Sequence, residues 1–508
     1  MDTETTYIPY LTDEKIRMAF LFQIPSFWPS WESFYHACLN DSRFDVKLLW
    51  LQETTMQNFQ IQMIAAEKFL REQNLPYESI DLFDLVSYAP HLVVIQSPYD
   101  VWHRTNTSFS LRFKQLGARI VYVPYGIEIS DMEDSRILHF YQFTILNAWR
   151  IYTFSDKMRI DYVKYCPNRA AVRVLGHPKF DGYIDKSRFA LPEIVQSNAA
   201  GRNILLWKMH FPALKRDGKH YIQITPCLEE YILFAEWVAS HNEFFFIYMP
   251  HPLMVGGGAN EVFRPQIIKL MAILESAANV YIDYTNDYRN ALLNADAIII
   301  DRSALMVEAG ITSVPILYMN NRNNTEKLTD AIVPLVESYY QGTTAKDMID
   351  FVEMFQLGQD PKGETRKNAF RECVPFADGK CGIRIADNIA KSIIEERPSP
   401  VPRVAIFAIG EIFHYYWETT NVLQSGNIEI VVLSDNNIAL HGTQFCGLPI
   451  VAPSTLREFD FDAIVIFSEQ FYRELFNQLA FEINIDIDKI LRLDKFLLWL
   501  SSLDGVSV

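Results

Sequence analysis

The chain has 508 residues, 49% of them apolar and 14% aromatic, which is enough for two or three packed domains and too many for one ordinary core. Its formal net charge of −16 argues against a broad nucleic-acid-binding surface, because such a surface needs a basic face. Six scattered cysteines show no C-x-x-C or His/Cys ligand spacing, so we expect neither a zinc site nor a disulfide framework, and a reducing compartment.

The first third of the chain alternates short apolar runs with helix-like stretches such as MQNFQIQMIAAEKFLREQN (56–74). The predicted strands are IRMAFLFQ (16–23), FDVKLLWL (44–51), HLVVIQS (91–97), ARIVYVPYG (118–126) and RIYTFS (150–155). This alternation predicts a parallel sheet with helices on both faces.

The same pattern restarts twice. The second set of predicted strands is NILLWKMHF (203–211), EFFFIYMPHP (243–252), NVYIDYT (279–285), ADAIIID (295–301) and VPILYM (314–319). The linker EERPSPVPR (395–403), with three prolines, suits a semi-rigid spacer. After it, VAIFAIGEIFHYYWE, IEIVVLSDNN and FDAIVIFS predict a third α/β domain.

Two doubly wound parallel-sheet domains followed by a smaller one are typical of the GT-B architecture with an appended Rossmann-like domain. We predict an acceptor-side domain at residues 1–190, a donor nucleotide-binding domain at 191–396 and an accessory domain at 397–508. Ligands of open α/β sheets bind beyond the carboxyl ends of the strands, so the site is expected in the cleft between the first two sheets.

The stretch ADAIIIDRSALMVEAG (295–310) carries charge from a predicted strand directly into a predicted helix. Ser303 can cap free N–H groups that also suit a phosphate, and Arg302 adds a cationic donor. Asp301 would repel a pyrophosphate, so we assign it to holding the loop. Glu308 could accept hydrogen bonds from a ribose diol, although a solvated Glu308 and a merely capping Ser303 are equally consistent with the local pattern.

Residues 286–319, NDYRNALLNADAIIIDRSALMVEAGITSVPILYM, resemble the donor-site segment of the CDP-glycerol glycerophosphotransferase family, which makes teichoic-acid and capsule polymers. The family has a Ser pair where this chain has Ser303 and Ala304. Three further segments are similar and follow in the family's order, so the resemblance spans roughly residues 15 to 395. They are VLGHPKFDGY (174–183), YMPHP (248–252) and YYQGTTAKDMIDFVEMFQLGQDPKGETR (339–366).

The resemblance implies that His251 handles donor phosphates, although a structural His-Pro turn is the alternative, and the Arg often found two residues earlier is Met249 here. The family's His-Gly, whose His is the general base on the acceptor hydroxyl, is matched by Tyr125-Gly126. A phenol with a pKa near 10 is a poor base at neutral pH. Either Glu128, His103 or His210 takes that role, or the acceptor differs; each of the three could also be an ordinary polar residue.

The third domain imitates a dinucleotide-binding fingerprint, with Asp435 near the place of a ribose-binding acid. However, Ala408 and Phe413 replace two of its glycines, and Phe413 should crowd the helix–strand packing. It resembles Rossmann-like modules on several polysaccharide-synthesis proteins, for which packing, oligomerisation or partner binding is favoured over a nucleotide. The D-x-D pairs also lie in this domain (Asp460/Asp462 and Asp486/Asp488), so a metal-independent transfer is preferred.

Three functions remain open: polyol-phosphate transfer from a CDP-activated donor to a polysaccharide or teichoic-acid-like acceptor, glycosyl transfer from a nucleotide sugar, and non-catalytic nucleotide binding in an assembly. The expected partners are the activated donor, used as a substrate without a further cofactor, and a polymeric or lipid-linked acceptor. No apolar run approaches the roughly 18 residues of a membrane span. MDTETTYIPY lacks the features of a signal peptide. We expect a cytoplasmic protein that contacts the inner membrane face, through KYCPNRAAVR (164–173) or FLLWL (496–500).

Overall fold

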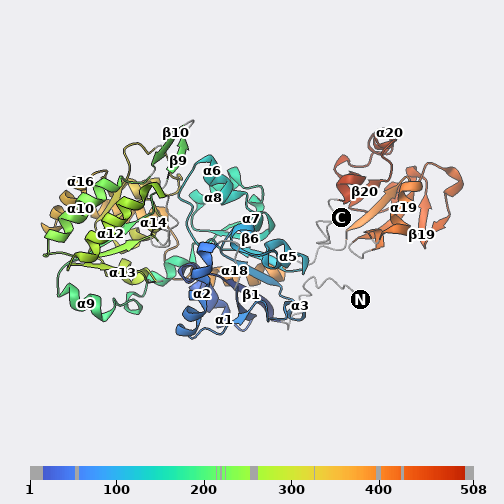
Figure 1. The fold of residues 1–508 in the computed structure, drawn as a ribbon. Coiled ribbons are helices and arrows are strands. Elements are labelled where there is room, and N and C mark those ends of the chain that lie inside the picture. Colours follow the sequence, from blue (N-terminus) through green and yellow to red (C-terminus); the bar gives the residue numbers. More distant parts are fainter. Residues whose placement is uncertain are drawn as a thin grey trace. The chain divides into compact units, whose positions relative to one another are not determined.

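In the computed structural model (Figure 1), the described residues form three β-sheets of six or seven strands and one two-stranded sheet. The residues that it describes are 15–51, 57–212, 214–217, 220–223, 225–251, 254, 261–285, 287–324, 326–395, 402–420, 422–424 and 428–497. One compact unit contains the first two sheets and runs to Ala390, and the residues from Lys391 onward belong to the other unit.

The first sheet is parallel throughout, with the order β3-β2-β1-β4-β5-β6-β7. Its strands are β1 (Ile16–Phe22), β2 (Phe44–Trp50), β3 (Glu78–Ser79), β4 (Leu92–Ile95), β5 (Arg119–Tyr122), β6 (Ala148–Thr153) and β7 (Val172–Val174). Its helices are α1 (Glu32–Leu39), α2 (Gln57–Glu72), α3 (Leu85–Tyr88), α4 (Asp100–His103), α5 (Ser110–Gln115), α6 (Glu133–Phe140), α7 (Phe143–Asn147) and α8 (Asp156–Tyr165). The predicted strands are present, and β3 and β7 are additional.

The second sheet has the order β12-β11-β8-β13-β14-β15, and its strands also run parallel. They are β8 (Ile204–Met209), β11 (Phe245–Pro250), β12 (Val280–Ile282), β13 (Ala297–Ile300), β14 (Ile316–Met319) and β15 (Tyr340–Gly342). An antiparallel hairpin, β9 (Leu214–Asp217) and β10 (His220–Gln223), was not predicted. The helices after β7 are α9 (Glu193–Ala199), α10 (Leu228–Ser240), α12 (Arg264–Ser276), α13 (Arg289–Asn294), α14 (Leu305–Ala309), α15 (Val333–Glu337), α16 (Ala345–Gln356), α17 (Gly363–Cys373) and α18 (Cys381–Glu395).

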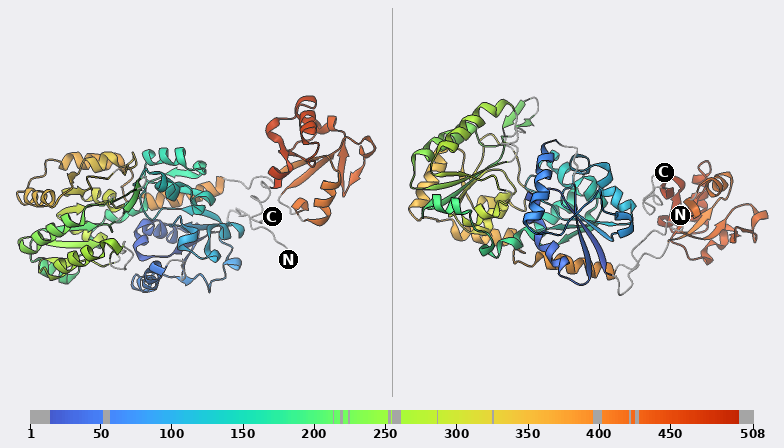
Figure 2. Two further views of the ribbon diagram at one scale, coloured as in Figure 1. Left: turned by 45° about the horizontal axis from the view of Figure 1, so that its top comes forward. Right: turned by 60° about the horizontal axis from the view of Figure 1, so that its bottom comes forward.

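Both sheets are covered by helices on their two faces, as the views in Figure 2 show. This explains why central strands such as β4 and β13 are apolar along their whole length: every residue of these two strands is buried. The two domains therefore form a GT-B-like pair of doubly wound parallel sheets, as the alternation of strands and helices predicts.

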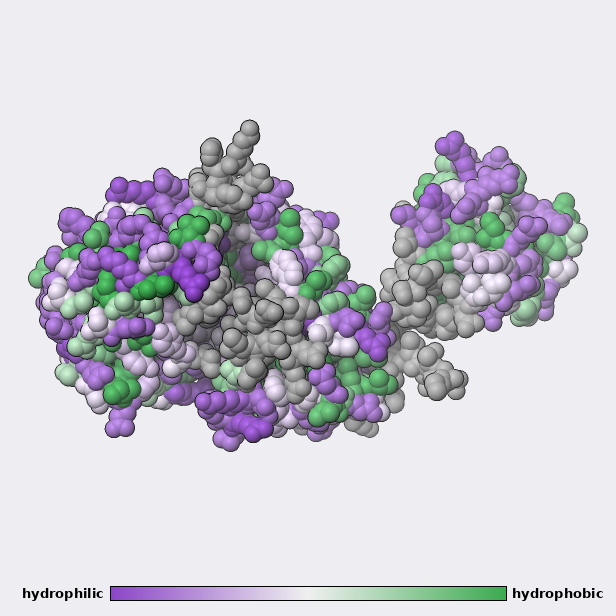
Figure 3. Space-filling view, in the orientation of Figure 1, coloured by the Kyte–Doolittle hydropathy of each residue, from purple (hydrophilic) through white to green (hydrophobic). Residues whose placement is uncertain are grey.

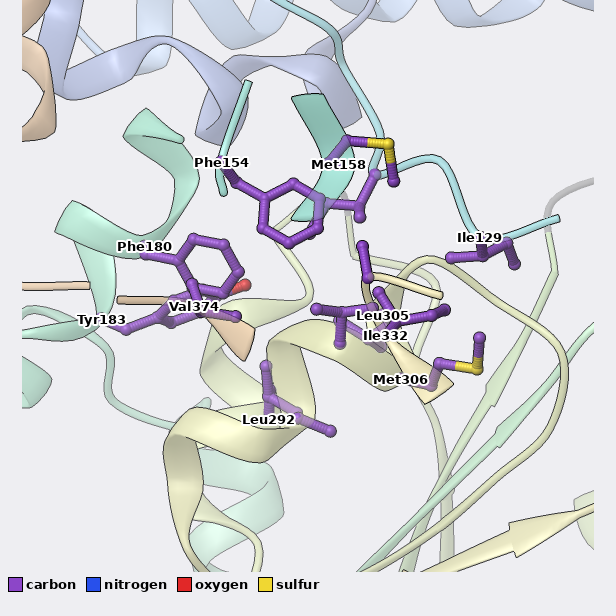
Figure 4. Packing of buried hydrophobic residues seen from close by; sticks show 14 of the residues in the cluster. Ile129, Phe154, Met158, Phe180, Tyr183, Leu292, Leu305, Met306, Ile332 and Val374 are labelled. Carbon is purple, nitrogen blue, oxygen red and sulfur yellow. The ribbon is translucent and has the colours of Figure 1, made fainter. Parts of the chain in front are cut away.

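One apolar core continues from the first domain into the second. Ile129 and Phe154 belong to the same buried cluster as Leu305 and Ile332, and Figure 4 shows these side chains converging between the two domains. Burial of each such side chain contributes about 1.5–3 kcal/mol relative to its exposed state. Because Leu305 opens α14, this packing holds the beginning of α14 against the first domain.

Helix α18 returns to the first domain. Tyr152 in β6 donates its hydroxyl to Asn388 Oδ1 at 2.8 Å, and Arg43 pairs with Asp387 at 2.5 Å. The α18 helix, which follows the second domain in sequence, thus braces the first sheet.

The third sheet is mixed and forms the C-terminal domain, with the order β18-β19-β17-β16-β20-β21. Its strands are β16 (Arg403–Phe407), β17 (Glu429–Ser434), β18 (Gln444–Phe445), β19 (Leu448–Val451), β20 (Ala463–Ile466) and β21 (Ile490–Arg492), and its helices are α19 (Glu411–Thr419) and α20 (Tyr472–Asn477). Only the β18–β19 pair is antiparallel. The remaining parallel strands give the domain its Rossmann-like α/β character.

The two segments expected at a membrane belong to different domains. In KYCPNRAAVR, Arg169 is exposed and begins the short 3-10 helix η3 (Arg169–Ala171) before β7. In FLLWL, Phe496 is buried in the core of the third domain, and residues 498–500 lie outside the described residues. Among the residues described, none of the helices is long and apolar enough to cross a membrane. Hydrophilic residues are spread over the visible face of all three domains (Figure 3).

Candidate functional site

The candidate site lies at the carboxyl ends of three adjacent strands in the second domain. β8 is at the point where the strand order reverses, since β11 follows it on one side and β13 on the other. Such a switch point is where open α/β sheets leave a crevice for a ligand. His210, His251 and Asp301 directly follow β8, β11 and β13.

Asp301 joins two of these strand ends. Its Oδ1 accepts the His210 backbone N–H at 2.8 Å, and its Oδ2 accepts the Tyr231 hydroxyl at 2.9 Å. Its side chain is fully buried, and burial raises the pKa of its carboxyl. Through these two hydrogen bonds Asp301 links the end of β13 to the end of β8 and to α10.

Lys208 is a buried cation that the sequence reasoning missed. Its Nζ donates to the carbonyls of Met209 at 3.3 Å, the last residue of β8, and Met249 at 3.4 Å, the residue before the last of β11. Burial lowers the pKa of Lys208, while the charges of Asp301 and Asp283 oppose that shift. The visible signal was a single charged residue in the otherwise apolar run ILLWKM.

The rings of His210 and His251 lie side by side, with centroids 4.7 Å apart. Burial and the neighbouring cations lower the pKa of His210 to about 3, and burial lowers that of His251 to about 2, so both rings are neutral at pH 7. His210 Nδ1 lies 2.9 Å from the carbonyl of Phe211, which can only accept. Nδ1 therefore carries the proton of the neutral ring, and Nε2 keeps a lone pair that can accept one.

Arg302 connects the second domain to the first through Glu326. Arg302 Nη2 donates to Glu326 Oε1 at 2.7 Å, and Ser130, which follows β5, donates to the same oxygen at 2.6 Å. His139 in α6 belongs to this cluster, because burial and the charge of Arg302 lower its pKa to about 4. Sequence reasoning missed Glu326 and His139, since neither follows a strand at the predicted cleft.

Ser303 and Glu308 lie around the short helix α14. Ser303 Oγ accepts the Leu305 N–H at 3.2 Å, in the turn directly before α14. Glu308 is almost fully buried, and it accepts hydrogen bonds from Lys179 at 2.9 Å and from the hydroxyls of Tyr183 and Tyr288. Glu308, for which the sequence suggested ribose binding, thus accepts hydrogen bonds from three protein groups in this structure.

Tyr125 and Gly126 approach the candidate site from the first domain. A Cβ placed on Gly126 would lie 3.9 Å from the Ala304 Cβ, so the loops after β5 and β13 meet. The Tyr125 ring stacks on Phe27, with centroids 4.0 Å apart. Burial raises the pKa of Tyr125, although a hydrogen bond from Tyr99 opposes the shift, and this moves the phenol further from the range of a neutral-pH base.

The two other alternative bases of the first domain are buried. Burial raises the pKa of Glu128 to about 7, and its Oε1 accepts the Tyr162 hydroxyl at 2.5 Å. His103 Nδ1 lies 2.7 Å from Ser97 Oγ, and burial lowers the pKa of His103 to about 3. Of the three alternatives, His210 is the half-buried one, and it lies in the second domain.

The segment between the two domains ties several of these groups together. His177 Nε2 lies 2.8 Å from the carbonyl of Pro124, directly before Tyr125, and Lys179 reaches Glu308. Asp181 accepts the backbone N–H groups of Cys381 and Gly382 at the start of α18. VLGHPKFDGY thus links the first domain, α14 and α18.

In the fingerprint-like loop of the third domain, the acidic side chain of Asp435 binds the loop's own backbone. Asp435 Oδ2 accepts the Ile409 N–H at 2.9 Å, and Ala408 has φ +69°, a conformation that favours glycine. Phe413 is fully buried and packs edge-on against Phe445 and Phe467. The aromatic ring that replaces a fingerprint glycine is therefore part of this domain's core.

The strand ends of the second domain can thus offer neutral imidazoles, a guanidinium and a hydroxyl to an anion. Because both histidine rings are neutral, the site has no buried imidazolium charge to desolvate. Arg302 keeps its positive charge beside Glu326. Donors held rigidly in a water-poor site stabilise developing negative charge more strongly than donors in water. Such a set of groups is suited to a phosphate or diphosphate.

Similarity to known proteins is found in the fold and in the C-terminal domain. Residues 401–491 match the family described as "C2185-like, N-terminal". No curated protein sequence matches the chain.

The similar solved structures cover the first two domains. A UDP-N-acetylglucosamine 2-epimerase is 13% identical, with a TM-score of 0.52, over 76% of this chain and 98% of that one. S. aureus MnaA with UDP is 15% identical, with a TM-score of 0.50, over 76% and 99%. The wall teichoic acid polymerase TagF with CDPG is 11% identical, with a TM-score of 0.50, over 75% and 90%. At these identities the similarity shows the fold alone, that of a GT-B-like pair of domains.

Proposed function

We propose that this protein transfers a polyol phosphate, such as glycerol phosphate, from a CDP-activated donor to a hydroxyl group of a cell-surface polysaccharide or teichoic-acid-like acceptor. The observation that carries the proposal is the neutral His210–His251 pair, 4.7 Å apart, beside Arg302 at the junction of the two domains. The resemblance of residues 286–319 to glycerophosphotransferases and the fold shared with TagF support the choice of donor.

In this proposal the acceptor oxygen attacks the phosphorus that carries the polyol. The new bond joins that oxygen to phosphorus, and the bond from phosphorus to the bridging oxygen of CMP breaks. His210 Nε2 accepts the acceptor's proton, because Nδ1–H is already donated to the Phe211 carbonyl, and the negative charge of the bound donor raises the lowered pKa of this ring toward the range of a useful base. Arg302, Ser303 and His251 meet the negative charge that develops on the phosphates and on CMP.

Turnover of the full-length protein tests this assignment. We expect CMP release from CDP-glycerol or CDP-ribitol, and H251A and S303A should each lower turnover by about 10²-fold or more if these groups stabilise developing charge. Matched controls are H241A and S276A, since His241 follows α10 and Ser276 ends α12. Unchanged kinetics in both site variants would discard the site.

A nucleotide-sugar reaction is the second candidate, because the MnaA structure with UDP and the 2-epimerase share the same fold. A donor panel separates the two: release of UDP, GDP or dTDP from a sugar donor, without CMP from CDP-polyols, would favour this alternative. Tyr125 stands in the place of the family's catalytic His. A third function, that of a non-catalytic nucleotide-binding assembly protein, is therefore also a candidate. Even slow donor hydrolysis by the purified chain would count against this third function.

A further inference from the structure

The arginine at the candidate site is already paired with a carboxylate. Arg302 directs Nε and Nη2 to the two carboxylate oxygens of Glu326, with Nη2 2.7 Å from Oε1. A guanidinium that pairs with two carboxylate oxygens in this way has the geometry with which it also pairs with two phosphate oxygens. Glu326 therefore occupies the face of Arg302 that a phosphate would use.

The Glu326 carboxylate is held in place from the first domain. Ser130 Oγ donates to Glu326 Oε1 at 2.6 Å, and Ser135 Oγ of α6 donates to Ser130 Oγ at 2.9 Å. The backbone beside it is fixed as well, because the Asp131 N–H donates to the Lys327 carbonyl at 2.8 Å. Glu326 thus reaches Arg302 from a loop that is bound to the first domain on both sides of the carboxylate's contacts.

The negative charge of Glu326 is poorly screened by water. Its side chain is 3% exposed, whereas that of Arg302 is 21% exposed. A phosphate brought to Arg302 while the carboxylate stays there would be repelled, since little water lies between the two anions to weaken the interaction. Whether a phosphate displaces the carboxylate or binds next to it, Glu326 lowers the affinity of the site for an anion.

The other cation at these strand ends does not replace Arg302. Lys208 is buried beneath the ends of β8 and β11, and it faces the negative charges of Asp301 and Asp283. Of these two cations, Arg302 is the more exposed and the one that a ligand can reach. A phosphate at this edge of the sheet must therefore compete with Glu326 for the guanidinium.

We propose that Glu326 sets the affinity of the site for a nucleoside diphosphate, because it pairs with Arg302 in the free protein and releases it to a phosphate of the ligand. In the bound state the guanidinium contacts the phosphate, and the carboxylate keeps the hydroxyl of Ser130. The pair forms again when the product nucleotide leaves, so Glu326 also limits how tightly the product is retained. The inference rests on the proposed function only in placing a phosphate at Arg302, and it does not depend on the base or on the group transferred.

A carboxylate that only orients Arg302 would give the opposite result on neutralisation. In that case the loss of its charge would loosen the guanidinium and weaken the binding of a diphosphate. If the carboxylate competes with the phosphate, the loss of its charge strengthens binding. E326Q separates the two roles, because glutamine has nearly the same size and keeps an oxygen for the Ser130 hydroxyl but carries no charge.

Calorimetric titration of the full-length protein with CDP, UDP, GDP and dTDP tests the proposal. We expect E326Q to bind the preferred diphosphate about tenfold more tightly than the wild type, or more, because a poorly screened repulsion is removed. The gain should be absent when R302M/E326Q is compared with R302M, since it requires the guanidinium.

D360N is the matched control, because Asp360 also pairs with a buried arginine. Its partner Arg366 donates to the Ser313 carbonyl, which precedes β14 and so lies at the opposite edge of the sheet from the site. D360N should bind the diphosphate like the wild type, although it also weakens an ion pair.

Thermal unfolding shows whether E326Q is folded. It leaves Arg302 without a counter-charge, so it should melt below the wild type, and the diphosphate should raise its melting temperature by more than that of the wild type. If E326Q does not melt cooperatively, S130A takes its place. This variant removes a hydroxyl that holds the carboxylate, and it should tighten diphosphate binding by about threefold.

Equal or weaker diphosphate binding by E326Q, or a gain that persists without Arg302, overturns the proposal. So does the absence of diphosphate binding by both the wild type and E326Q, whereas binding by E326Q alone supports it. A gain in E326Q without CMP release from CDP-polyols would count against the proposed function and leave the role of Glu326 standing.

Discussion

Lys179 and Glu308 form a buried ion pair across the two domains, with Nζ 2.9 Å from Oε1. Lys179 follows β7 of the first domain, and Glu308 lies in α14 of the second. The same carboxylate also accepts the hydroxyls of Tyr183 and Tyr288. A residue expected at the donor's ribose therefore holds the two domains together in this structure.

Removal of one partner of this pair should destabilise the protein. E308Q leaves the Lys179 ammonium buried without a counter-charge, so the free energy of unfolding should fall by roughly 3–5 kcal/mol. The double variant K179M/E308Q should recover part of that loss, because no unpaired charge remains. Urea unfolding measures both, with E337Q as an exposed control that should shift stability by less than about 0.5 kcal/mol. Wild-type stability with lost nucleotide affinity in E308Q would show that Glu308 serves the ligand.

Tyr125 and His210 should respond differently to substitution. Y125F keeps the ring stacked on Phe27 and removes only a hydroxyl whose pKa is raised by burial, so turnover should change by no more than a few-fold. H210A removes the proposed proton acceptor and should lower turnover by about 10²–10⁴-fold, the usual contribution of general base catalysis. Steady-state kinetics on the best donor decide between them. A Y125F variant without activity would mean that Tyr125 of the first domain, and not His210, supplies the general base.

Glu128 should make stability fall as pH rises. Burial raises its pKa in the folded protein to about 7, above the ordinary 4.5, so the folded state binds more protons than the unfolded state between these values. E128Q should remove this component, and its stability advantage over the wild type should grow from pH 5 to pH 8, to at most roughly 3 kcal/mol. Melting temperatures across that range test the slope.

The quantity to follow is the stability difference between E128Q and the wild type at each pH. The absolute stability also contains the histidines, whose lowered pKa values make stability rise with pH. His139 has a folded pKa of about 4, below its ordinary 6.5, so it contributes stability that is lost as pH falls through this range. A pH-independent difference between E128Q and the wild type would mean that Glu128 is ionised throughout.

The third domain should be dispensable for nucleotide binding. A chain that ends at Glu395 keeps α18 and its contacts from Asn388 to Tyr152 and from Asp387 to Arg43, so it should melt cooperatively and bind the same nucleotides. A shorter chain that ends at Lys380 lacks α18 and should lose cooperative unfolding. Calorimetry of unfolding and of nucleotide binding measures both. A well-folded 395-residue chain that binds no donor accepted by the full chain would place the third domain in the active site.

The sequence by itself determined the order of strands and helices in the first two domains. AIII is an uninterrupted apolar run and IRMAFLF is apolar except for Arg17, a composition that a strand buried on both faces favours. The switch point at β8 follows from this order and the rules of parallel sheets, so His210, His251 and Asp301 could be predicted at one edge. The elements missed were β3, β7 and β15, of two or three residues each, and the β9–β10 hairpin. Runs this short carry little periodicity.

Only the tertiary structure decided what each polar side chain contacts. Glu308 could be assigned to a helix from the sequence, but its partner Lys179 is 129 residues away, and no local pattern connects them. The proton on His210 Nδ1 depends on the Phe211 carbonyl, and the place of Lys208 depends on the register between β8 and β11. Hydrogen bonds and charge pairs act over a few ångströms and require the final packing, whereas hydrophobic burial acts on the pattern of many residues and is already visible in the chain.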